Sequence, residues 1–484
     1  MRIALIIAPA WSTLTAPLGI ASMAGAFRQA GHEVRVFDFN IRLWKMFNHL
    51  PEDMWSYSNF RDWAFEDEFN QKTLPALQLK IPPLVDEVMD WCPDLVGFSL
   101  YDTSINCGRV FALEFKGRRS DLPIIYGGPG AGLWNLRKGR DFERGAVDVV
   151  VVGEGELTGL EVVDRIRQGM DMSGCLGTLH LDEKGELKQE LPRSNIHLND
   201  LPLPYFGDFD FNDYRHLALP IMMSRGCVAK CTFCSETRFW NKFRYREASH
   251  VIQEMTESRQ SDWPTHYLVA DSLVNGNFRV LGDLARQVIE KGLNVTWGGY
   301  ARLDRRMTPE LLSAMHRSGC QYLSYGLETG SQAVMDAMEK HTTVEGAKRV
   351  IRDTYMAGIE VHLNIVVGFP TETEEDFQDT LNFLTECREW ISIVNTGETC
   401  GIAVNTPLWD DPHRFLITTN STGGVMPGIR GEWESQGGAN NAEVRHDRLR
   451  RLRELLDQWE EIIWFPRGPR PDQVARRHIP EFHP

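Results

Sequence analysis

The sequence is short of positive charge. Among its 484 residues, 52 are Lys or Arg and 67 are Asp or Glu, which gives a net charge of −15. A nucleic-acid-binding surface needs a cluster of basic residues, so this balance argues against general nucleic-acid binding. The sequence also lacks an uninterrupted apolar run of about eighteen residues, the length that a membrane-spanning helix requires. We therefore expect a protein that does not span a membrane.

A disulfide framework is missing as well. Six of the nine cysteines are scattered, at positions 92, 107, 175, 320, 387 and 400. A chain of this size with free thiols is typical of a reducing compartment. The apolar N-terminus resembles a signal peptide, but Pro9, Ser12 and Thr13 interrupt it, so we interpret it as part of the fold. We expect the protein to be cytoplasmic.

The other three cysteines lie within eight positions, in the segment CVAKCTFC. Cys227, Cys231 and Cys234 are separated by four and three positions, so one loop can bring their thiols to one metal centre. The apolar run before them, residues 219–223, predicts a buried strand, and Gly226 allows the chain to leave it sharply. Two basic side chains beside the thiols favour the thiolate form.

The number of cysteines in this segment separates two kinds of metal site. A structural zinc ion usually takes four ligands, and no nearby second cysteine pair or His pair completes such a set. Three thiolates on an iron–sulfur cluster leave one iron open to another ligand. The alternatives are a zinc knuckle and ordinary buried thiols.

The first 165 residues alternate between short apolar strands and helices. We expect strands at 3–7, 33–38, 94–99, 123–126 and 148–152, and helices at 18–30 and 103–118. Gly31 is placed to end the first helix. This pattern predicts a Rossmann-like α/β domain, in which ligands bind beyond the carboxyl ends of the strands. The sequence assigns no role to the aromatic-rich insertion at 41–90.

A second alternation of strands and helices begins near residue 216. We expect strands at 219–223, 266–270, 295–300, 322–326, 360–367 and 391–394, with helices starting near Ser249, Asn277, Thr308, Ser331 and Glu374. Six such units predict a partial parallel α/β barrel over 216–398, with its reactive residues at the carboxyl ends of the strands. The proline-containing stretch 166–215 is interpreted as a linker. The region 399–484, with loops and a charged helix, is interpreted as a cap over the barrel or an oligomer contact.

Several motifs together carry a resemblance to one family. They are PLGIA at 17–21, AGHEVRVFD at 30–38, GFSLYDTS at 97–104, YGGPGA at 126–131, VVGEGE at 151–156 and CVAKCTFC at 227–234. This set resembles the radical S-adenosylmethionine (SAM) enzymes that carry a cobalamin-binding domain, and in particular the methyltransferases among them. The resemblance implies a Rossmann-like cobalamin-binding domain, then a partial (β/α)6 TIM-like barrel, then a C-terminal loop and helix cap.

The resemblance also assigns cofactors to residues. Cys227, Cys231 and Cys234 would ligate a [4Fe–4S] cluster and so be catalytic. Cobalamin would contact the loops after the strands of the first domain, through Pro17, Leu18, Gly19, Ser99, Tyr101, Thr103, Ser104, Gly127, Gly128, Pro129, Val152, Gly153, Glu154, Gly155 and Glu156. SAM would contact Phe233, Asp271, Arg302 and Glu328.

Some of these assignments have alternatives. Asp271 could instead face the substrate, and Arg302 and Glu328 could instead form salt bridges within the barrel mouth. Much of the corrinoid-binding superfamily carries a D-x-H-x-x-G loop whose His ligates cobalt, and the first 165 residues have none. The resemblance therefore implies cobalamin without a His ligand on its lower face. Trp11 lies near the corrin in this interpretation, or else is a core or lid aromatic.

The function that the resemblance implies is methylation of an unactivated carbon in a small-molecule or natural-product substrate. In that family an electron donor such as flavodoxin or ferredoxin reduces the cluster, SAM yields a 5′-deoxyadenosyl radical, and cobalamin delivers the methyl group. One alternative is a cyclisation or rearrangement with the same cofactors and no methyl transfer. Another is a non-catalytic metal- or corrinoid-binding protein. A methylthiotransferase is disfavoured, because the first domain has no second three-cysteine set.

Overall fold

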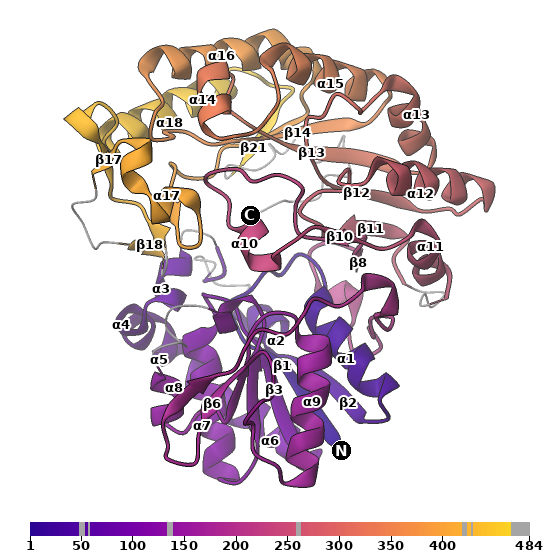
Figure 1. Ribbon diagram of the computed structural model, residues 1–484, viewed down its shortest axis with the longest axis vertical. Helices are drawn as coiled ribbons and strands as arrows, with labels where there is room; N and C mark the ends of the chain where they lie inside the picture. Colours follow the sequence, from indigo (N-terminus) through magenta and orange to yellow (C-terminus); the bar gives the residue numbers. More distant parts are fainter. Residues whose placement is uncertain are drawn as a thin grey trace. The chain divides into compact units, whose positions relative to one another are not determined.

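The structure is a computed structural model, and it describes residues 1–47, 54–56, 59–132, 139–257, 263–418, 424–426 and 429–465. The chain divides into two compact units, Met1–Leu217 and Ala218–Pro484 (Figure 1). None of the helices in these ranges is long and apolar enough to cross a membrane.

The first unit is built on a seven-stranded sheet in the order β2-β1-β3-β4-β5-β6-β7. Its strands are β1 (Arg2–Ile7), β2 (Glu33–Asp38), β3 (Leu95–Ser99), β4 (Ile124–Gly127), β5 (Val149–Val151), β6 (Thr178–Leu181) and β7 (Leu187–Gln189). The first five strands are parallel, and β6 and β7 extend the sheet with antiparallel pairing. The segment 166–215, which we expected to be a linker, therefore supplies two strands of this sheet.

Helices cover the sheet of the first unit. The longer ones are α1 (Leu18–Gln29), α2 (Phe39–Phe47), α6 (Ile81–Asp90), α7 (Ile105–Arg118) and α9 (Gly155–Gln168). Helix α1 packs against α9, and α6 packs against α7 (Figure 1). Gly159 allows the close approach of α1, because a Cβ there would lie 2.8 Å from Cε of Met23. Gly31 ends α1 as expected, with φ of +86°.

The aromatic residues of the 41–90 insertion belong to the core of the first unit. Trp55 and Trp63 are buried in the same apolar cluster as strands β1 and β3. The indole of Trp55 donates a hydrogen bond to Oδ1 of Asn40 (2.7 Å), and that of Trp63 donates to the carbonyl of Met54 (2.8 Å). The insertion thus enlarges the core of the unit.

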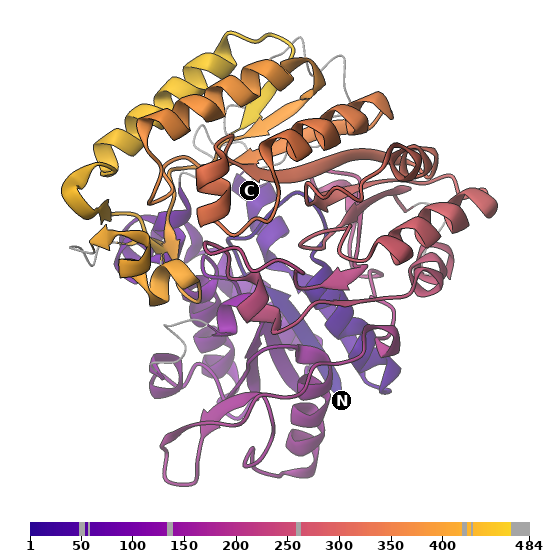
Figure 2. The same cartoon turned by 45° about the horizontal axis from the view of Figure 1, so that its top comes forward.

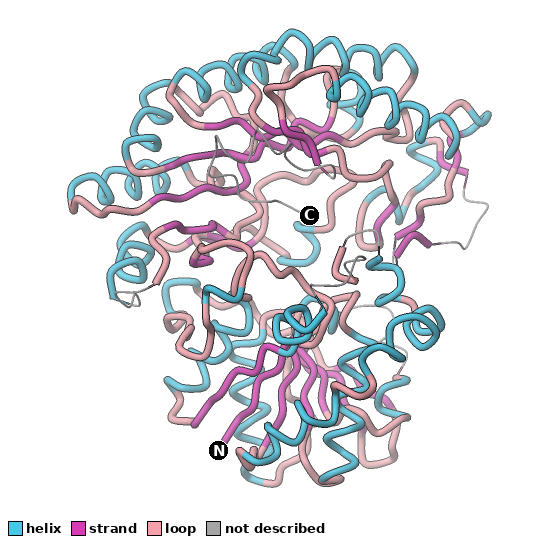
Figure 3. The backbone as a smooth tube through the Cα atoms, turned by 180° about the vertical axis from the view of Figure 1, so that it is seen from behind, coloured by secondary structure: helices cyan, strands magenta, loops and turns pink. Residues whose placement is uncertain are grey.

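The second unit contains seven parallel strands in the order β21-β15-β14-β13-β12-β11-β8. Their bounds are β8 (Leu219–Ile221), β11 (His266–Val269), β12 (Thr296–Ala301), β13 (Cys320–Glu328), β14 (Glu360–Ile365), β15 (Ile393–Asn395) and β21 (Ile463–Phe465). The six expected strands are all present. The seventh, β21, comes from the region that we expected to be a cap or an oligomer contact, and it pairs with β15. Figure 3 shows the strands as one curved row.

Helices lie outside this row of strands (Figure 2). They are α11 (Ala248–Glu257), α12 (Phe278–Glu290), α13 (Pro309–Arg317), α14 (Gln332–Ala337), α15 (Val344–Met356), α16 (Glu374–Cys387) and α18 (Ala442–Asp457). Side-chain caps begin several of them, at Asn277, Thr308, Ser331, Thr343 and Thr373. Such caps satisfy backbone N–H groups that a helix leaves unpaired, which explains why the predicted helix starts were close to the observed ones.

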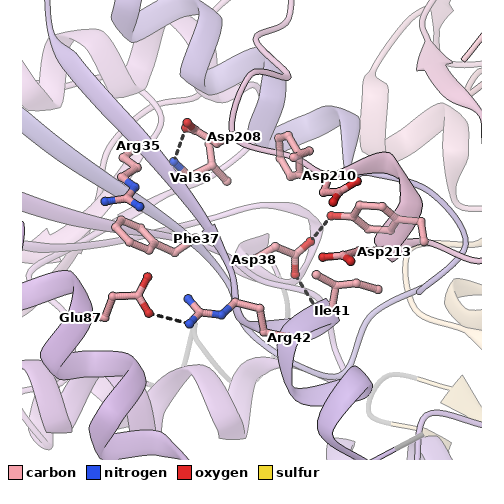
Figure 4. A pocket seen from close by; sticks show the side chains of 12 residues that line it. Arg35, Val36, Phe37, Asp38, Ile41, Arg42, Glu87, Asp208, Asp210 and Asp213 are labelled. Carbon is pink, nitrogen blue, oxygen red and sulfur yellow. Dashed lines mark hydrogen bonds and ion pairs between the residues drawn. The ribbon is translucent and has the colours of Figure 1, made fainter. Parts of the chain in front are cut away.

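The segment after β7 folds back over the edge strand β2 of the first unit. Backbone N–H groups of Tyr205 and Arg215 donate to the carbonyls of Ala21 and Thr13. The carboxylate of Asp208 accepts a hydrogen bond from the N–H of Val36 in β2 (2.8 Å). A cavity of about 390 Å³ lies between this segment, β2 and α2 (Figure 4). The edge strand is therefore covered by the chain itself.

Asp38 lies at this cavity and is buried. Its carboxylate accepts hydrogen bonds from the N–H of Ile41 (2.9 Å) and the hydroxyl of Tyr214 (2.7 Å). Burial raises the pKa of Asp38 from 3.8 to about 6. The folded state thus binds the Asp38 proton more tightly than the unfolded state does, so stability falls as the pH rises between these two values and stays constant above them.

We predict that Asp38→Asn removes this pH dependence. The wild-type free energy of unfolding should fall by up to about 3 kcal/mol between about pH 4 and pH 6, relative to the variant. Chemical denaturation of both proteins across this range measures the difference. Asp90→Asn, at an exposed position of α6, should keep the wild-type slope. Parallel wild-type and Asp38→Asn profiles would contradict this account.

Candidate active site

The cysteine segment forms a loop at the carboxyl end of the first barrel strand. The chain passes from β8 through the short strand β9 (Ser224–Arg225) into the loop, which ends at α10 (Glu236–Trp240). Gly226 makes the exit, with φ of +81°, and a Cβ there would lie 3.0 Å from the carbonyl oxygen of Lys242. The thiols of Cys227, Cys231 and Cys234 are free and only partly buried.

The loop is held by hydrogen bonds to two other regions of the second unit. The N–H of Thr232 donates to the carbonyl of Met338 (3.1 Å), and the carbonyl of Thr232 accepts from the N–H of Leu408 (3.1 Å). The Thr232 hydroxyl also donates to the carbonyl of Ala337 (3.2 Å). Phe233 packs against an apolar cluster that contains Leu408 and Phe369. These contacts give the loop backbone a defined shape.

The three thiols of the loop suit an iron–sulfur cluster. In an iron–sulfur cluster each thiolate binds its own iron, so the sulfurs need not meet at one point. Burial raises the pKa of Cys231 and of Cys234, the latter to about 11, and nearby Lys340 and Arg302 oppose the rise at Cys231.

A buried ion pair lies beside the cysteine loop. Nζ of Lys340 lies 3.0 Å from Oε1 of Glu328, and both side chains are about nine-tenths buried. Glu328 ends β13 in a left-handed conformation, with φ of +70°. A Cβ at Gly326 would lie 2.4 Å from Oε1 of Glu328, so only glycine leaves room for the pair. Nζ of Lys340 also lies 5.8 Å from the centre of the Phe233 ring.

Arg302 reaches the same place from the end of β12. Its backbone N–H donates to Oδ1 of Asn275 (2.9 Å), and Nδ2 of Asn275 donates to the carbonyl of Arg302 (2.8 Å). Its guanidinium donates to the carbonyl of Lys340 (2.6 Å). These contacts bring Arg302, Glu328 and Phe233 together beside the cysteine loop, and their contact with SAM stays a prediction.

Asp271 is engaged differently. Its carboxylate is buried and accepts hydrogen bonds from the N–H of Met223 (2.8 Å) and the hydroxyl of Ser224 (2.6 Å). Burial raises the pKa of Asp271 to about 7. One oxygen thus holds a backbone N–H and the other a side-chain hydroxyl of the segment that leads into the cysteine loop. This observed role supports the shape of the loop, and a direct contact of Asp271 with a cofactor stays a prediction.

Lys340 was not among the residues singled out from the sequence. It follows α14, between Glu339 and His341, which both have positive φ, of 55°. No motif or spacing links it to the cysteines, because the chain returns to the site through a turn that only tertiary packing defines. A lone basic residue after a short helix gives no signal of such a return.

In the first unit, the sequence-predicted residues lie in four loops at one edge of the sheet. These loops follow β1, β3, β4 and β5, and they contain Pro17, Tyr101, Thr103, Ser104, Gly128, Pro129, Val152, Gly153 and Glu154. Ser99 and Gly127 are the last residues of β3 and β4, Leu18 and Gly19 begin α1, and Gly155 and Glu156 begin α9. The strand order reverses between β1 and β3, which is where open parallel sheets bind ligands. The loops therefore share the position expected of a ligand site.

An aromatic pair marks this reversal of strand order. Trp11 follows β1 and Tyr101 follows β3, and their rings stack with centres 3.4 Å apart and planes 7° apart. The loop after β4 lies close to the loop after β3, since a Cβ at Gly128 would lie 2.7 Å from the carbonyl oxygen of Leu100. By contrast, a Cβ at Gly19 or Gly153 would meet no atom within 4 Å, so the backbone there faces open space.

Sequence comparison identifies proteins that are similar to this chain. Residues 221–384 match the family model described as the Radical SAM superfamily. An uncharacterized methyltransferase of Pyrococcus horikoshii is 26% identical over 79% of this chain and 77% of its own length. An anaerobic magnesium-protoporphyrin IX monomethyl ester cyclase of Rubrivivax gelatinosus is 27% identical over 50% of this chain. The chain matches only 45% of that cyclase.

Solved structures share the fold over most of the chain. The cobalamin-dependent SAM radical enzyme OxsB, solved with aqua-cobalamin and SAM, has a TM-score of 0.71 at 14% identity, over 94% of this chain and 66% of OxsB. The radical SAM methyltransferase TsrM of Kitasatospora setae, solved with cobalamin and a [4Fe–4S] cluster, has a TM-score of 0.65 at 18% identity. That match covers 87% of this chain and 81% of TsrM.

The chain therefore contains a radical SAM domain. The fold over most of the chain is that of the cobalamin-dependent radical SAM enzymes OxsB and TsrM, so the fold class expected from the sequence is confirmed.

We predict that Lys340→Met destabilises the second unit, because it leaves the Glu328 carboxylate buried without its cation. The loss should be about 3 kcal/mol in the free energy of unfolding, as for other broken buried pairs. The double variant Lys340→Met/Glu328→Gln should recover part of it. Chemical denaturation of the three proteins measures this coupling.

Lys348→Met is the matched control for this prediction. Lys348 pairs with Glu386 on the surface, where the Glu386 side chain is 60% exposed. An exposed pair contributes at most about 1 kcal/mol, so this variant should unfold nearly as the wild type does. Equal losses of unfolding free energy in the two lysine variants would show that the buried Glu328–Lys340 pair stabilises the protein no more than an exposed pair does.

Proposed function

We propose that this protein is a cobalamin-dependent radical SAM methyltransferase that methylates an unactivated carbon of a small-molecule substrate. The observation that carries the proposal is the grouping of three partly exposed thiols with Arg302, Glu328 and Lys340 at the carboxyl end of a barrel of parallel strands. That edge is where barrel enzymes hold their reactive groups.

The cysteine site fits a [4Fe–4S] cluster with an open iron. Cys227, Cys231 and Cys234 would be its ligands, and a fourth protein ligand is not needed because SAM can occupy the remaining iron. The other cysteines within the described ranges are buried, except Cys92, which lies exposed at the end of α6 in the first unit. Only the loop therefore offers thiols that are grouped and accessible.

The charged side chains next to the loop fit the amino-acid end of SAM. That end carries one ammonium and one carboxylate, and the site offers both signs of charge in a poorly solvated place. Glu328 would bind the ammonium, and Arg302 and Lys340 would bind the carboxylate. The ring of Phe233, partly buried against apolar side chains, would border the adenine.

The first unit fits a large flat cofactor at its loop edge. Gly19 and Gly153 expose backbone without side chains, which permits close approach of a ligand. The stacked rings of Trp11 and Tyr101 offer an aromatic surface where the strand order reverses. We assign cobalamin to this edge, contacted by the four loops after β1, β3, β4 and β5.

When bound, the cluster with SAM supplies a carbon radical and cobalamin supplies a methyl group; the chemistry belongs to these cofactors. The protein orients and shields them. The hydrogen bonds of Thr232 keep the cysteine loop in place, and the buried pair of Glu328 and Lys340 presents fixed charges at little reorganisation cost. Apolar packing around Phe233 would exclude water from the place where the radical forms, and so would prevent side reactions of the radical.

The proposed chemistry also requires an electron donor and a suitable compartment. One-electron chemistry requires a low-potential donor, and a flavodoxin or ferredoxin would serve. A cytoplasmic location agrees with the free thiols and with the oxygen sensitivity of such a cluster. The net charge of −15 disfavours a polyanionic substrate.

We predict that anaerobic reconstitution with iron, sulfide and hydroxocobalamin yields protein that cleaves SAM to 5′-deoxyadenosine after reduction. Replacement of Cys227, Cys231 and Cys234 by Ala should abolish this product, because the cluster loses its ligands. Chromatography of the reaction mixture measures 5′-deoxyadenosine. Cys92→Ala removes an exposed thiol outside the loop and should leave the product unchanged.

The same samples separate the competing functions. With SAM labelled in its methyl group, methyl transfer predicts label on the protein-bound corrinoid. SAM cleavage without labelled corrinoid would instead favour the cyclisation or rearrangement that the cyclase relative suggests. Continued 5′-deoxyadenosine formation by the triple Ala variant would overturn the cluster assignment. No 5′-deoxyadenosine formation by the wild type would favour a non-catalytic binding protein.

A further inference from the structure

The turn after β14 packs directly on the C-terminal helix α18. Gly368 in this turn has φ of +82°, and a Cβ there would lie 2.4 Å from Cγ and Cδ of Arg445 in α18. Arg445 is almost fully buried and donates to the carbonyls of Trp433 (2.9 Å) and Gly431 (3.0 Å). Helix α18 and the turn are thus in van der Waals contact, with no room for a side chain at Gly368.

A second arginine of α18 holds the turn through a carboxylate. Nη1 of Arg448 lies 3.1 Å from Oε2 of Glu372, and the two side chains are 3% and 2% exposed. The same Oε2 accepts a hydrogen bond from the N–H of Gly368 (2.9 Å). Arg448 also donates to the backbone carbonyl of Glu372 (3.2 Å). The conformation of the turn therefore depends on a buried charge supplied by α18.

Asn440, two positions before the first residue of α18, holds the next peptide of the turn. Nδ2 of Asn440 donates to the carbonyl of Phe369 (2.8 Å), and Asn440 is buried. The N–H of Gly368, through Glu372, and the carbonyl of Phe369 are thus both held by contacts that involve the C-terminal region. Asn440 contacts the turn directly, and Arg448 acts through Glu372; both residues lie outside residues 221–384, the segment that matches the Radical SAM model.

The turn is also joined to the candidate active site. The N–H of Val366 donates to the carbonyl of Glu328 (2.9 Å), and Phe369 lies in the apolar cluster against which Phe233 packs. Docking of α18 would not by itself require buried charge, because Leu449, Leu452 and Leu456 already bury apolar surface. Burying an arginine is costly unless it is paired. The burial of Arg448 against this turn therefore needs an explanation other than the attachment of α18 to the barrel.

We propose that Arg448 and Asn440 are positioning residues for SAM: they hold the Gly368–Phe369 turn in the shape that borders the adenosine part of the cofactor. This inference rests on the proposed function. The C-terminal region would then help to shape the SAM site, in addition to packing over the barrel.

Arg448→Met tests the inference, and Arg451→Met is its matched control. Both arginines lie on α18 and both contact Glu374, but only Arg448 reaches Glu372. The first measurement is hydrogen–deuterium exchange of the protein without cofactors. Peptides that cover residues 366–372 should exchange faster in Arg448→Met and remain at the wild-type rate in Arg451→Met.

The second measurement is SAM binding to the anaerobically reconstituted protein, by equilibrium dialysis with labelled SAM. Misplacement of the turn in Arg448→Met should raise the Kd for SAM about tenfold or more. The KM for SAM cleavage should rise in parallel while kcat at saturating SAM changes less, since the residue does not touch the reacting atoms. Arg451→Met should keep wild-type values.

Asn440→Ala provides an independent variant if Arg448→Met does not fold, and the same faster exchange and weaker SAM binding are expected of it. Unchanged exchange at 366–372 in the folded variants would overturn the positioning role. Faster exchange with wild-type affinity for SAM would show that the turn does not border SAM, and would overturn it too. A wild-type protein that fails to bind SAM would instead refute the proposed function, whatever the variants do.

Discussion

The cysteine loop depends on the two hydrogen bonds of the Thr232 backbone. One goes to the carbonyl of Met338, after α14, and the other comes from the N–H of Leu408, in the C-terminal region. A loop of eight residues with three thiols has little internal structure, so its shape must come from its neighbours. Thr232 connects the loop to both of them, and its peptide groups are buried, where an unmade hydrogen bond would be costly.

Charge is placed around this loop in an uneven way. The chain as a whole is acidic, yet Arg302 and Lys340 stand beside Cys231, with Glu328 as the partner of Lys340. A site that contains thiolates and is to bind a zwitterionic ligand needs local positive charge, whatever the net charge of the chain is. Because these groups are poorly solvated, their interactions are stronger than on the surface, and each one needs a partner. This requirement explains why the site residues contact one another.

Sequence patterns predicted the parts of the fold that depend on local physics. Apolar runs indicated the parallel strands, capping residues such as Thr308 and Ser331 lay at the predicted helix starts, and the cysteine spacing indicated the metal-binding loop. Contacts made at long range were missed. Lys340 reaches the site through a turn, and Arg448 reaches Glu372 across 76 positions. Strands β7 and β21 were also missed, because three-residue strands have too little pattern to separate them from loops.

The central claim is that three thiolates hold a cluster whose fourth iron binds SAM. Mössbauer spectroscopy of protein reconstituted with ⁵⁷Fe, before and after addition of SAM, tests it most directly. The account predicts the spectrum of a [4Fe–4S] cluster in which one iron site of the four changes when SAM is added. A spectrum of a different iron species, or a [4Fe–4S] spectrum that saturating SAM leaves unchanged, would contradict it.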